Sequence, residues 1–334
     1  MKKNNLQLKL IAVFIFFSLA IIAGLRSGND PDYQNYRNIY DYASISSVDI
    51  EPFYLWINQL FKLLGISFEG LILLIALASV MLKCMAVIKY SEYFFLSIVI
   101  YISSIYLLFD LIAIRQGFSI ALIMLSLRLW ENRKLSALLL ILIASLFHIA
   151  SLSFIPVLFL VGRDFSKKFL IICLFFLSSI IVGSQVFSLM DFIQTISFLP
   201  GFVSSKIAIY SSYDKEAVSS YKQILVSILA YIVYTKVNCS QYVKSCCLVY
   251  IFGSIFTTLF SSVGDIAFRL KWFFLWTEII FVPYTIQPLL TRINNQEGRI
   301  LVKGTFFALI SILYIYSAYT FVNSVNERGA SLIF

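Results

Sequence analysis

Charged and titratable side chains lie inside long apolar stretches of this chain. Arg115 interrupts "LFDLIAIRQGFSIALIMLSL" (residues 108–127), and His148, the only histidine, lies in "ASLFHIASLSFIP". A guanidinium keeps its charge, and placing one in hydrocarbon costs at least ~2.5–3.5 kcal/mol. Asp265 and Arg269, four residues apart and so on one helix face, begin another apolar stretch. Several such groups at one depth indicate a polar cavity open to one side of the membrane.

These residue types favour one kind of chemistry. Arginine is the preferred side chain for bidentate binding of phosphate oxygens, and histidine can accept a proton near neutral pH. The combination predicts transfer of a group from a phosphate-linked donor, with the arginines stabilising the charge on a diphosphate leaving group. A structural interpretation stays open for each residue. Asp110 could neutralise Arg115, Asp265 could neutralise Arg269, and a lone histidine at a helix bend is more often structural than catalytic.

The elements that position these groups are predicted to be membrane helices. The chain has 334 residues, 60% hydrophobic and 13% charged, with a mean hydropathy of +0.89. Its apolar runs are continuous rather than alternating, which predicts an all-α, polytopic protein with about 11 transmembrane helices. We expect one membrane domain over 1–334, with outer loops 26–68 and 188–220 above the cavity. The helices are expected at 8–25, 67–88, 92–110, 112–130, 134–148, 149–162, 168–187, 221–237, 243–263, 268–288 and 301–322.

Two segments need separate treatment. The segment 52–65, "PFYLWINQLFKLLG", is too short to cross the bilayer and is predicted to be interfacial or re-entrant. The first helix follows a basic "MKKNNLQLK" and could pass for a signal peptide. Because no convincing cleavage site follows, an uncleaved signal-anchor is the favoured interpretation.

Lysine and arginine predict the orientation. Most of the 26 basic residues, with Lys83 and Lys89 among them, fall on loops and flanks that are cytoplasmic if the N-terminus is cytoplasmic. The C-terminus is then outside, and 134–162 is a hairpin that turns near "FHIAS", because both of its flanks are basic. Arg115 and His148 lie near the outer surface on this topology. The net charge of +9 is therefore a topology signal spread over loops, and it does not indicate nucleic-acid binding.

The first outer segment begins "RSGNDPDYQNYRNIYDY" and interleaves carboxylates with tyrosines, including Tyr33 and Tyr36. Such a surface could bind sugars, since hydroxyls favour carboxylate acceptors and sugar rings favour flat aromatic faces. On this feature alone, a solvated loop with interfacial tyrosines is the favoured interpretation. The five cysteines form no metal motif and are expected to be reduced. We expect no metal and no cofactor.

Five short blocks resemble, in order, the recurring blocks of EpsG-like polysaccharide polymerases, which belong with the bacterial Wzy polymerases. They are "RSGNDPDYQNYRNIY", "EPFYLWIN", "AIRQGFSIA", "ASLFHIASLSFIP" and "IAFRLKWFF". The resemblance implies a GT-C-like architecture shared with Wzy and O-antigen ligase. It also implies an inner-membrane glycosyltransferase that joins oligosaccharide repeats carried on undecaprenyl diphosphate at the outer face. The segment "NNQEGRILVKG" and the tail match nothing in the family pattern, which leaves acceptor specificity open.

Carrying the family blocks over implies particular site residues. His148, Glu51 and Asp30 are the catalytic candidates, with Glu51 the reserve base. Donor diphosphate and sugar would be bound by Arg26, Arg115, Gln116 and Arg269. The residue patterns described above add Asp265, Tyr33 and Tyr36 as candidates for the same binding site. The expected partners are the lipid-linked oligosaccharide, the bilayer and, as a further candidate, a chain-length regulator.

Three other functions remain open. Intramembrane charge would serve a transporter or flippase of a lipid-linked sugar equally well, although no inverted repeat is evident. A membrane acyltransferase could use His148 as its base, but its donor would usually come from the cytoplasmic side. A non-catalytic membrane scaffold is the third alternative.

Overall fold

The computed structural model describes residues 2–26, 28, 30–42, 51–183, 221–261 and 264–327. Every regular element within those ranges is a helix, so the predicted all-α class is confirmed. The chain divides into two compact units. Unit 1 comprises Met1–Leu152 and Ile286–Phe334, and unit 2 comprises Ser153–Thr285. The single membrane domain stays a prediction, and the predicted outer loop 188–220 lies outside the described residues.

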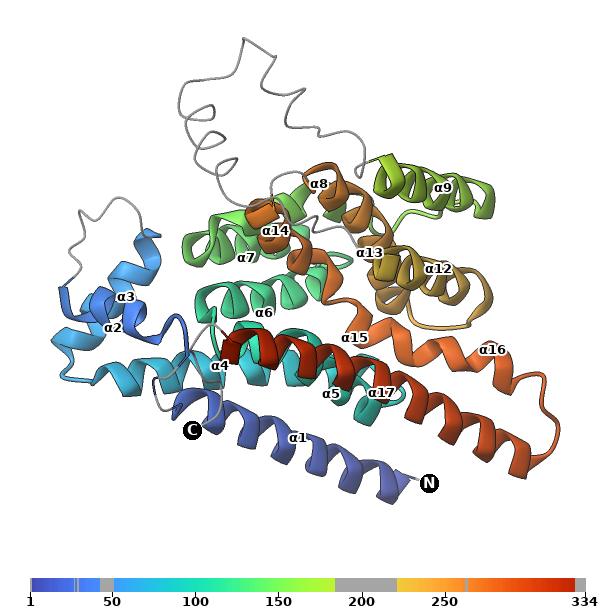
Figure 1. Cartoon of the computed structure of the whole chain (residues 1–334), viewed down its shortest axis with the longest axis horizontal. Coiled ribbons are helices and arrows are strands. Elements are labelled where there is room, and N and C mark those ends of the chain that lie inside the picture. The colour runs from blue at the N-terminus through green and yellow to red at the C-terminus, as the bar shows by residue number, and fades with distance from the viewer. Residues whose placement is uncertain are drawn as a thin grey trace, which may run out of the picture. The chain divides into compact units, whose positions relative to one another are not determined.

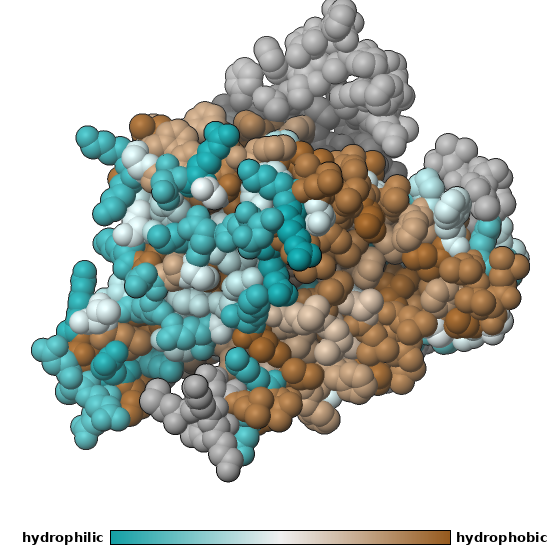
Figure 2. Space-filling view, turned by 180° about the vertical axis from the view of Figure 1, so that it is seen from behind, coloured by the Kyte–Doolittle hydropathy of each residue, from teal (hydrophilic) through white to brown (hydrophobic). Residues whose placement is uncertain are grey.

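Helix length and composition make this a multi-pass membrane protein. Five helices in the described ranges are long and apolar enough to cross a bilayer: Leu6–Gly24, Phe68–Tyr90, Gln241–Leu259, Ala267–Leu290 and Gln296–Glu327. Three further apolar segments are shorter, namely Phe94–Asp110, Lys134–Phe147 and Ile149–Leu158. The predicted total of about 11 spans is therefore not confirmed. Hydrophobic side chains cover a wide area of the face seen in Figure 2, as expected for a surface in contact with lipid.

In unit 1, α1 (Lys2–Gly24) packs along α4 (Phe68–Tyr90) (Figure 1). The approach is close at Gly24, where a Cβ atom would collide with the backbone and side chain of Leu73. Ser67 begins α4, because its Oγ accepts a hydrogen bond from the Gly70 amide at 3.3 Å. α4 in turn packs against α5, η1 and α6.

The helices that follow are shorter. They are α5 (Phe94–Tyr101), the π-helix η1 (Ile102–Asp110), α6 (Ile114–Leu129) and α7 (Lys134–Phe147). The 16 residues of α6 reach about 24 Å, and the 14 residues of α7 about 21 Å, against about 30 Å of hydrocarbon. The sequence predicted helices over nearly the same ranges.

Two further helices of unit 1, α2 (Tyr33–Tyr42) and α3 (Pro52–Leu63), pack against each other, and α3 also packs against α7. They lie beside the start of α4 at the left of Figure 1. Tyr36 and Tyr54 are buried in one hydrophobic cluster with Phe68, Ile114 and Phe147. The short helix expected at 52–65 is therefore present. Its proline at the first helical position starts it without losing a helical hydrogen bond.

A buried charge network ties η1 to α4. Lys83 donates to Asp110 Oδ1 at 2.6 Å and to Ser79 at 2.8 Å, while Tyr101 donates to Asp110 Oδ2 at 2.7 Å. The Lys83 and Asp110 side chains are 0% and 1% exposed. Gly117 lets α6 fold back onto η1, since a Cβ there would collide with the Phe109 carbonyl. The alternative in which Asp110 neutralises Arg115 is therefore wrong, since Asp110 pairs with Lys83. Lys83, which was expected on a cytoplasmic flank, is buried within α4.

The region 134–162 does not form one long helix. α7 ends at Phe147, and His148 is extended, with φ −156° and ψ 109°. The return arm is not the helix predicted over 149–162. It is a 3-10 helix η2 (Ile149–Ser153), mostly in unit 1, followed by α8 (Phe154–Leu158), which belongs to unit 2. A break at "FHIAS" is confirmed, and the orientation of the two arms stays a prediction.

Unit 2 packs α9 (Lys167–Gly183), α12 (Tyr221–Lys236) and α14 (Gly264–Leu275) around α13 (Gln241–Leu259). Gly253 of α13 meets Phe274 so closely that no Cβ would fit. The helix predicted over 268–288 is instead broken into α14, α15 (Glu278–Phe281), η3 (Val282–Ile286) and α16 (Gln287–Leu290). Pro283 lies in η3 and Pro288 in the first turn of α16, and they account for the interruptions there, because proline lacks an amide hydrogen and crowds the preceding turn.

The last helix, α17 (Gln296–Glu327), has 32 residues and returns to unit 1, where it packs on α5 and η1. Its sides are largely exposed, as expected of a helix surrounded by lipid. Leu301, Leu313 and Tyr316 are 70%, 61% and 66% exposed. The predicted helix 301–322 is confirmed, with longer ends on both sides.

Candidate functional site

Arg115 lies at the first turn of α6, where this helix meets α2 and α3. Its Nη1 forms an ion pair with Glu51, the residue that precedes Pro52 and caps α3. The guanidinium also lies over two aromatic rings, 5.6 Å from the Tyr36 centroid and 5.5 Å from the Tyr54 centroid. The Arg115 and Glu51 side chains are 21% and 19% exposed, so the pair is partly shielded from water. The structure thus explains how Arg115 is tolerated.

A second arginine–carboxylate pair lies in the segment between α1 and α2. Arg26 Nε is 2.9 Å from Asp30 Oδ2, and the two side chains are 5% and 4% exposed. Asp30 also accepts a hydrogen bond from the Asp32 amide at 3.2 Å, which shapes the turn into α2. Burial raises the pKa of the Asp30 carboxyl, and the attraction to Arg26 opposes that rise.

The arginines of both pairs influence Tyr36 electrostatically. Burial raises the pKa of the Tyr36 hydroxyl, while the positive charges of Arg115 and Arg26 both act to lower it. Burial raises the pKa of Tyr54 in the same way, opposed by the same two arginines. Arg26 lies 5.7 Å from the ring centroid of Tyr33. The site therefore has two guanidinium groups, two carboxylates and three tyrosines, and both buried phenols remain neutral donors at ordinary pH.

Several nitrogen atoms of these arginines lack partners. Nη1 and Nη2 of Arg26 and Nε of Arg115 are buried and have no hydrogen-bond partner within the described residues. Buried donors are nearly always satisfied, and an unsatisfied one costs about 1–3 kcal/mol. Unfilled guanidinium forks beside neutral tyrosines form a site suited to an anion with several oxygens, such as a phosphate.

The other predicted residues of unit 1 lie close to this site. Gln116, which follows Arg115, is 4% exposed. His148 is half-buried at the end of α7. The preceding Phe147 packs against Phe53 of α3 and Phe118 of α6, with ring centroids 5.1 and 4.6 Å apart. His148 therefore lies near the helix ends that carry Glu51 and Arg115, although its role as a base stays a prediction.

Two predicted residues belong to the other unit. Arg269 is an exposed residue of α14 in unit 2. The side chain of Asp265 lies outside the described part of the chain. The expected joint action of Arg269 with Arg115 therefore stays a prediction.

The sequence analysis missed a buried carboxylate. Glu278 is 1% exposed at the start of α15, and its nearest cation is Lys222, 3.5 Å away. An acidic residue within "FFLWTEIIFV" is the same signal that singled out Arg115, so the sequence could have indicated it. Cys84, Cys173, Cys239, Cys246 and Cys247 are all free. Over the described residues, no group of three or more His, Cys, Asp or Glu side chains could hold a metal ion.

Comparison with known proteins gives one match. The EpsG family model matches residues 9–330, which is nearly the whole chain and includes both arginine–carboxylate pairs. No curated protein and no solved structure matches the chain.

Proposed function

The chain belongs to the EpsG family, which is linked to exopolysaccharide biosynthesis, and we propose that it polymerises lipid-linked oligosaccharide repeat units. The donor would be a growing chain on undecaprenyl diphosphate at the outer face of the inner membrane. The acceptor would be the next repeat unit on its own lipid carrier.

The observation that carries this proposal is the pair of buried guanidinium groups with unfilled donors. Arg26 has two free Nη atoms and Arg115 a free Nε within the described residues, each beside a single carboxylate. One carboxylate cannot occupy all donors of a guanidinium fork. A diphosphate offers several more acceptor oxygens, and hydrogen bonds between charged groups contribute about 1.5–3 kcal/mol each.

The proposed reaction is a single displacement. An acceptor hydroxyl oxygen forms a bond with the anomeric carbon of the donor sugar, and the bond from that carbon to the diphosphate oxygen breaks. The electron pair leaves with the diphosphate, where Arg26 and Arg115 stabilise the added negative charge. His148 accepts the hydroxyl proton, with Glu51 as the alternative base.

The tyrosines and carboxylates suit the sugars of both substrates. Tyr33, which is half-buried beside Arg26, offers an aromatic face and a polar tip that suit a sugar ring and its hydroxyls. The buried Tyr36 and Tyr54 would instead hold the Arg115 guanidinium in place. Asp30 and Glu51 can each accept hydrogen bonds from sugar hydroxyls in addition to their arginine.

The test is a reaction with purified components. Cells that lack the gene should accumulate the single lipid-linked repeat unit, which is then extracted and mixed with the full-length protein in detergent. We expect a ladder of longer lipid-linked glycans and release of undecaprenyl diphosphate, without added sugar nucleotide. An Arg26→Gln/Arg115→Gln variant should form no ladder, whereas Arg37→Gln, at an exposed arginine of α2, should behave as wild type.

The same reaction separates the alternatives. A transporter would leave the repeat unit unchanged in detergent and would instead move it across a vesicle membrane. An acyltransferase would add acyl mass without extending the glycan. Either result would replace the polymerase proposal.

A further inference from the structure

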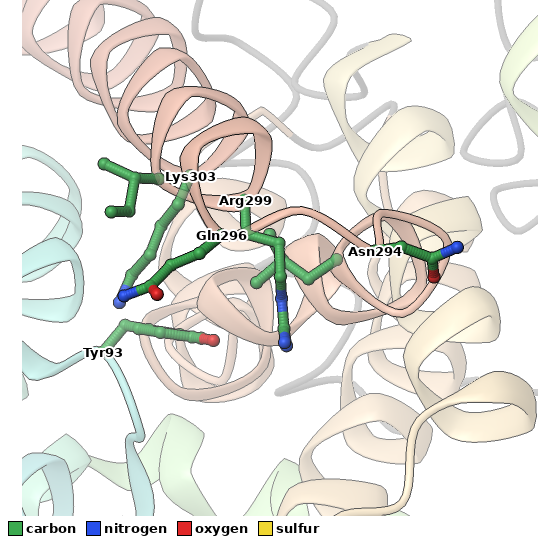
Figure 3. Close-up of a pocket in the computed structure, with 7 residues that line it drawn as sticks. Tyr93, Asn294, Gln296, Arg299 and Lys303 are labelled. Carbon is green, nitrogen blue, oxygen red and sulfur yellow. The ribbon is translucent and has the colours of Figure 1, made fainter.

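A cavity of about 460 Å³ lies in unit 1, far along the chain from the arginine site. It is lined by Tyr93, Leu290, Asn294, Gln296, Arg299, Ile300 and Lys303. In Figure 3, the side chains of Gln296, Arg299 and Lys303 descend from the first turns of α17 toward Tyr93, while Asn294 points away.

The cavity is positively charged. Lys303 Nζ lies 4.6 Å from the Tyr93 ring centroid and 5.6 Å from that of Phe307, which holds its charge over an aromatic face. Neither Arg299 nor Lys303 has an ion pair among the residues the structure describes. The adjacent Glu92 carboxylate accepts a hydrogen bond from Gln287 Nε2. Two unpaired cations in one concave site favour an anionic ligand.

The cavity also borders a surface suited to lipid. Ile300, which lines it, is 65% exposed, and the neighbouring Leu301 and Leu289 are 70% and 47% exposed. These side chains continue into the exposed apolar flank of α17, a helix long enough to cross a membrane. A ligand that carries a phosphate at the end of an apolar chain would satisfy both parts of the site.

We propose that this cavity binds the phosphate of an anionic membrane lipid. Arg299 and Lys303 contact the phosphate oxygens, Gln296 and Tyr93 offer hydrogen bonds to the head group, and the acyl chains lie along Ile300 and α17. The proposal is independent of the polymerase function, because none of these residues belongs to the arginine site.

The test measures lipid binding to the full-length protein by titration under native mass spectrometry. The probes are phosphatidylglycerol, diacylglycerol with the same acyl chains, and soluble glycerol phosphate. Each cation near a charged membrane surface contributes about 1 kcal/mol, or about fivefold in affinity. Arg299→Gln/Lys303→Gln should therefore weaken phosphatidylglycerol binding about 25-fold.

The control is Arg292→Gln. Arg292 is an exposed arginine shortly before α17, and it does not line the cavity. It should bind phosphatidylglycerol as wild type does. Equal binding of phosphatidylglycerol and diacylglycerol, or an unaffected double variant, would overturn the proposal. Glycerol phosphate binding as tightly as phosphatidylglycerol would also overturn it, since the site would then take soluble phosphates.

Discussion

Arg115→Lys is the sharpest test of the arginine site. Lysine keeps the positive charge near Glu51 but lacks the planar fork that can contact two acceptors at once. If one charged hydrogen bond to the diphosphate is lost in the transition state, the loss is about 1.5–3 kcal/mol. That energy corresponds to a fall of about 10- to 150-fold in kcat/KM.

The expected effect on stability is smaller. The cation stays over Tyr36 and Tyr54, and cation–π contacts at partly exposed sites contribute only about 0.5–1 kcal/mol each. The melting temperature in detergent should therefore change by a few degrees at most. A large loss of activity with little loss of stability is the pattern of a residue that contacts substrate.

The assay is polymerisation of the extracted lipid-linked repeat unit, with initial rates measured over a range of substrate concentrations. Arg37→Lys is the matched control, because Arg37 lies on the exposed side of α2 in an ion pair with Glu69. If Arg115→Lys polymerises within about threefold of wild type at equal protein level, the fork has no catalytic role. Arg115 would then only hold α6 to α3 through Glu51.

Three further predictions follow from other parts of the fold. His148→Ala should slow polymerisation by about 10²–10⁴-fold while donor binding and melting temperature stay unchanged. If His148→Ala is fully active and Glu51→Gln is inactive, Glu51 is the general base instead. Lys83→Met should destabilise the protein by about 3–5 kcal/mol in unfolding titrations, because it leaves Asp110 buried and unpaired. Lys83→Met/Asp110→Leu should recover most of that loss, and no recovery would contradict the account of the pair. Burial raises the pKa of Asp30 above 3.8, so its contribution to stability is greatest below pH ~4 and falls as pH rises through the folded pKa. The melting temperature of Asp30→Asn should therefore depend less on pH than that of the wild type. An unchanged dependence of melting temperature on pH would refute this assignment.

Much of the fold could be predicted because hydropathy is a local property. Each apolar run that ends at charged or turn residues gave a helix near the predicted range, as for α4, α6 and α7. The exceptions occur where local chemistry overrides composition. The run 268–288 contains two prolines, and 149–162 contains one together with a 3-10 turn. The extent of each apolar run was therefore easier to predict than whether the run forms one unbroken helix.

The site residues were predictable for a related reason. A charge inside an apolar helix is costly, so Arg115 could be singled out without any structure. The resemblance to a family added Arg26, Asp30 and Glu51. In the structure Glu51 pairs with Arg115, and Arg26 pairs with Asp30. Tyr54 was missed because an interfacial tyrosine has no distinctive local signal.

The partners of the charges were decided by tertiary structure alone. Asp110 is close to Arg115 in sequence, yet the end of the π-helix and the turn before α6 direct it toward Lys83. Arg115 instead pairs with Glu51, 64 residues away along the chain. Sequence determines which residues must be neutralised, because the cost of burying a charge depends on the residue and its apolar surroundings. The partner that neutralises each charge depends on how helices that are distant in sequence pack together. Only the tertiary structure shows that packing.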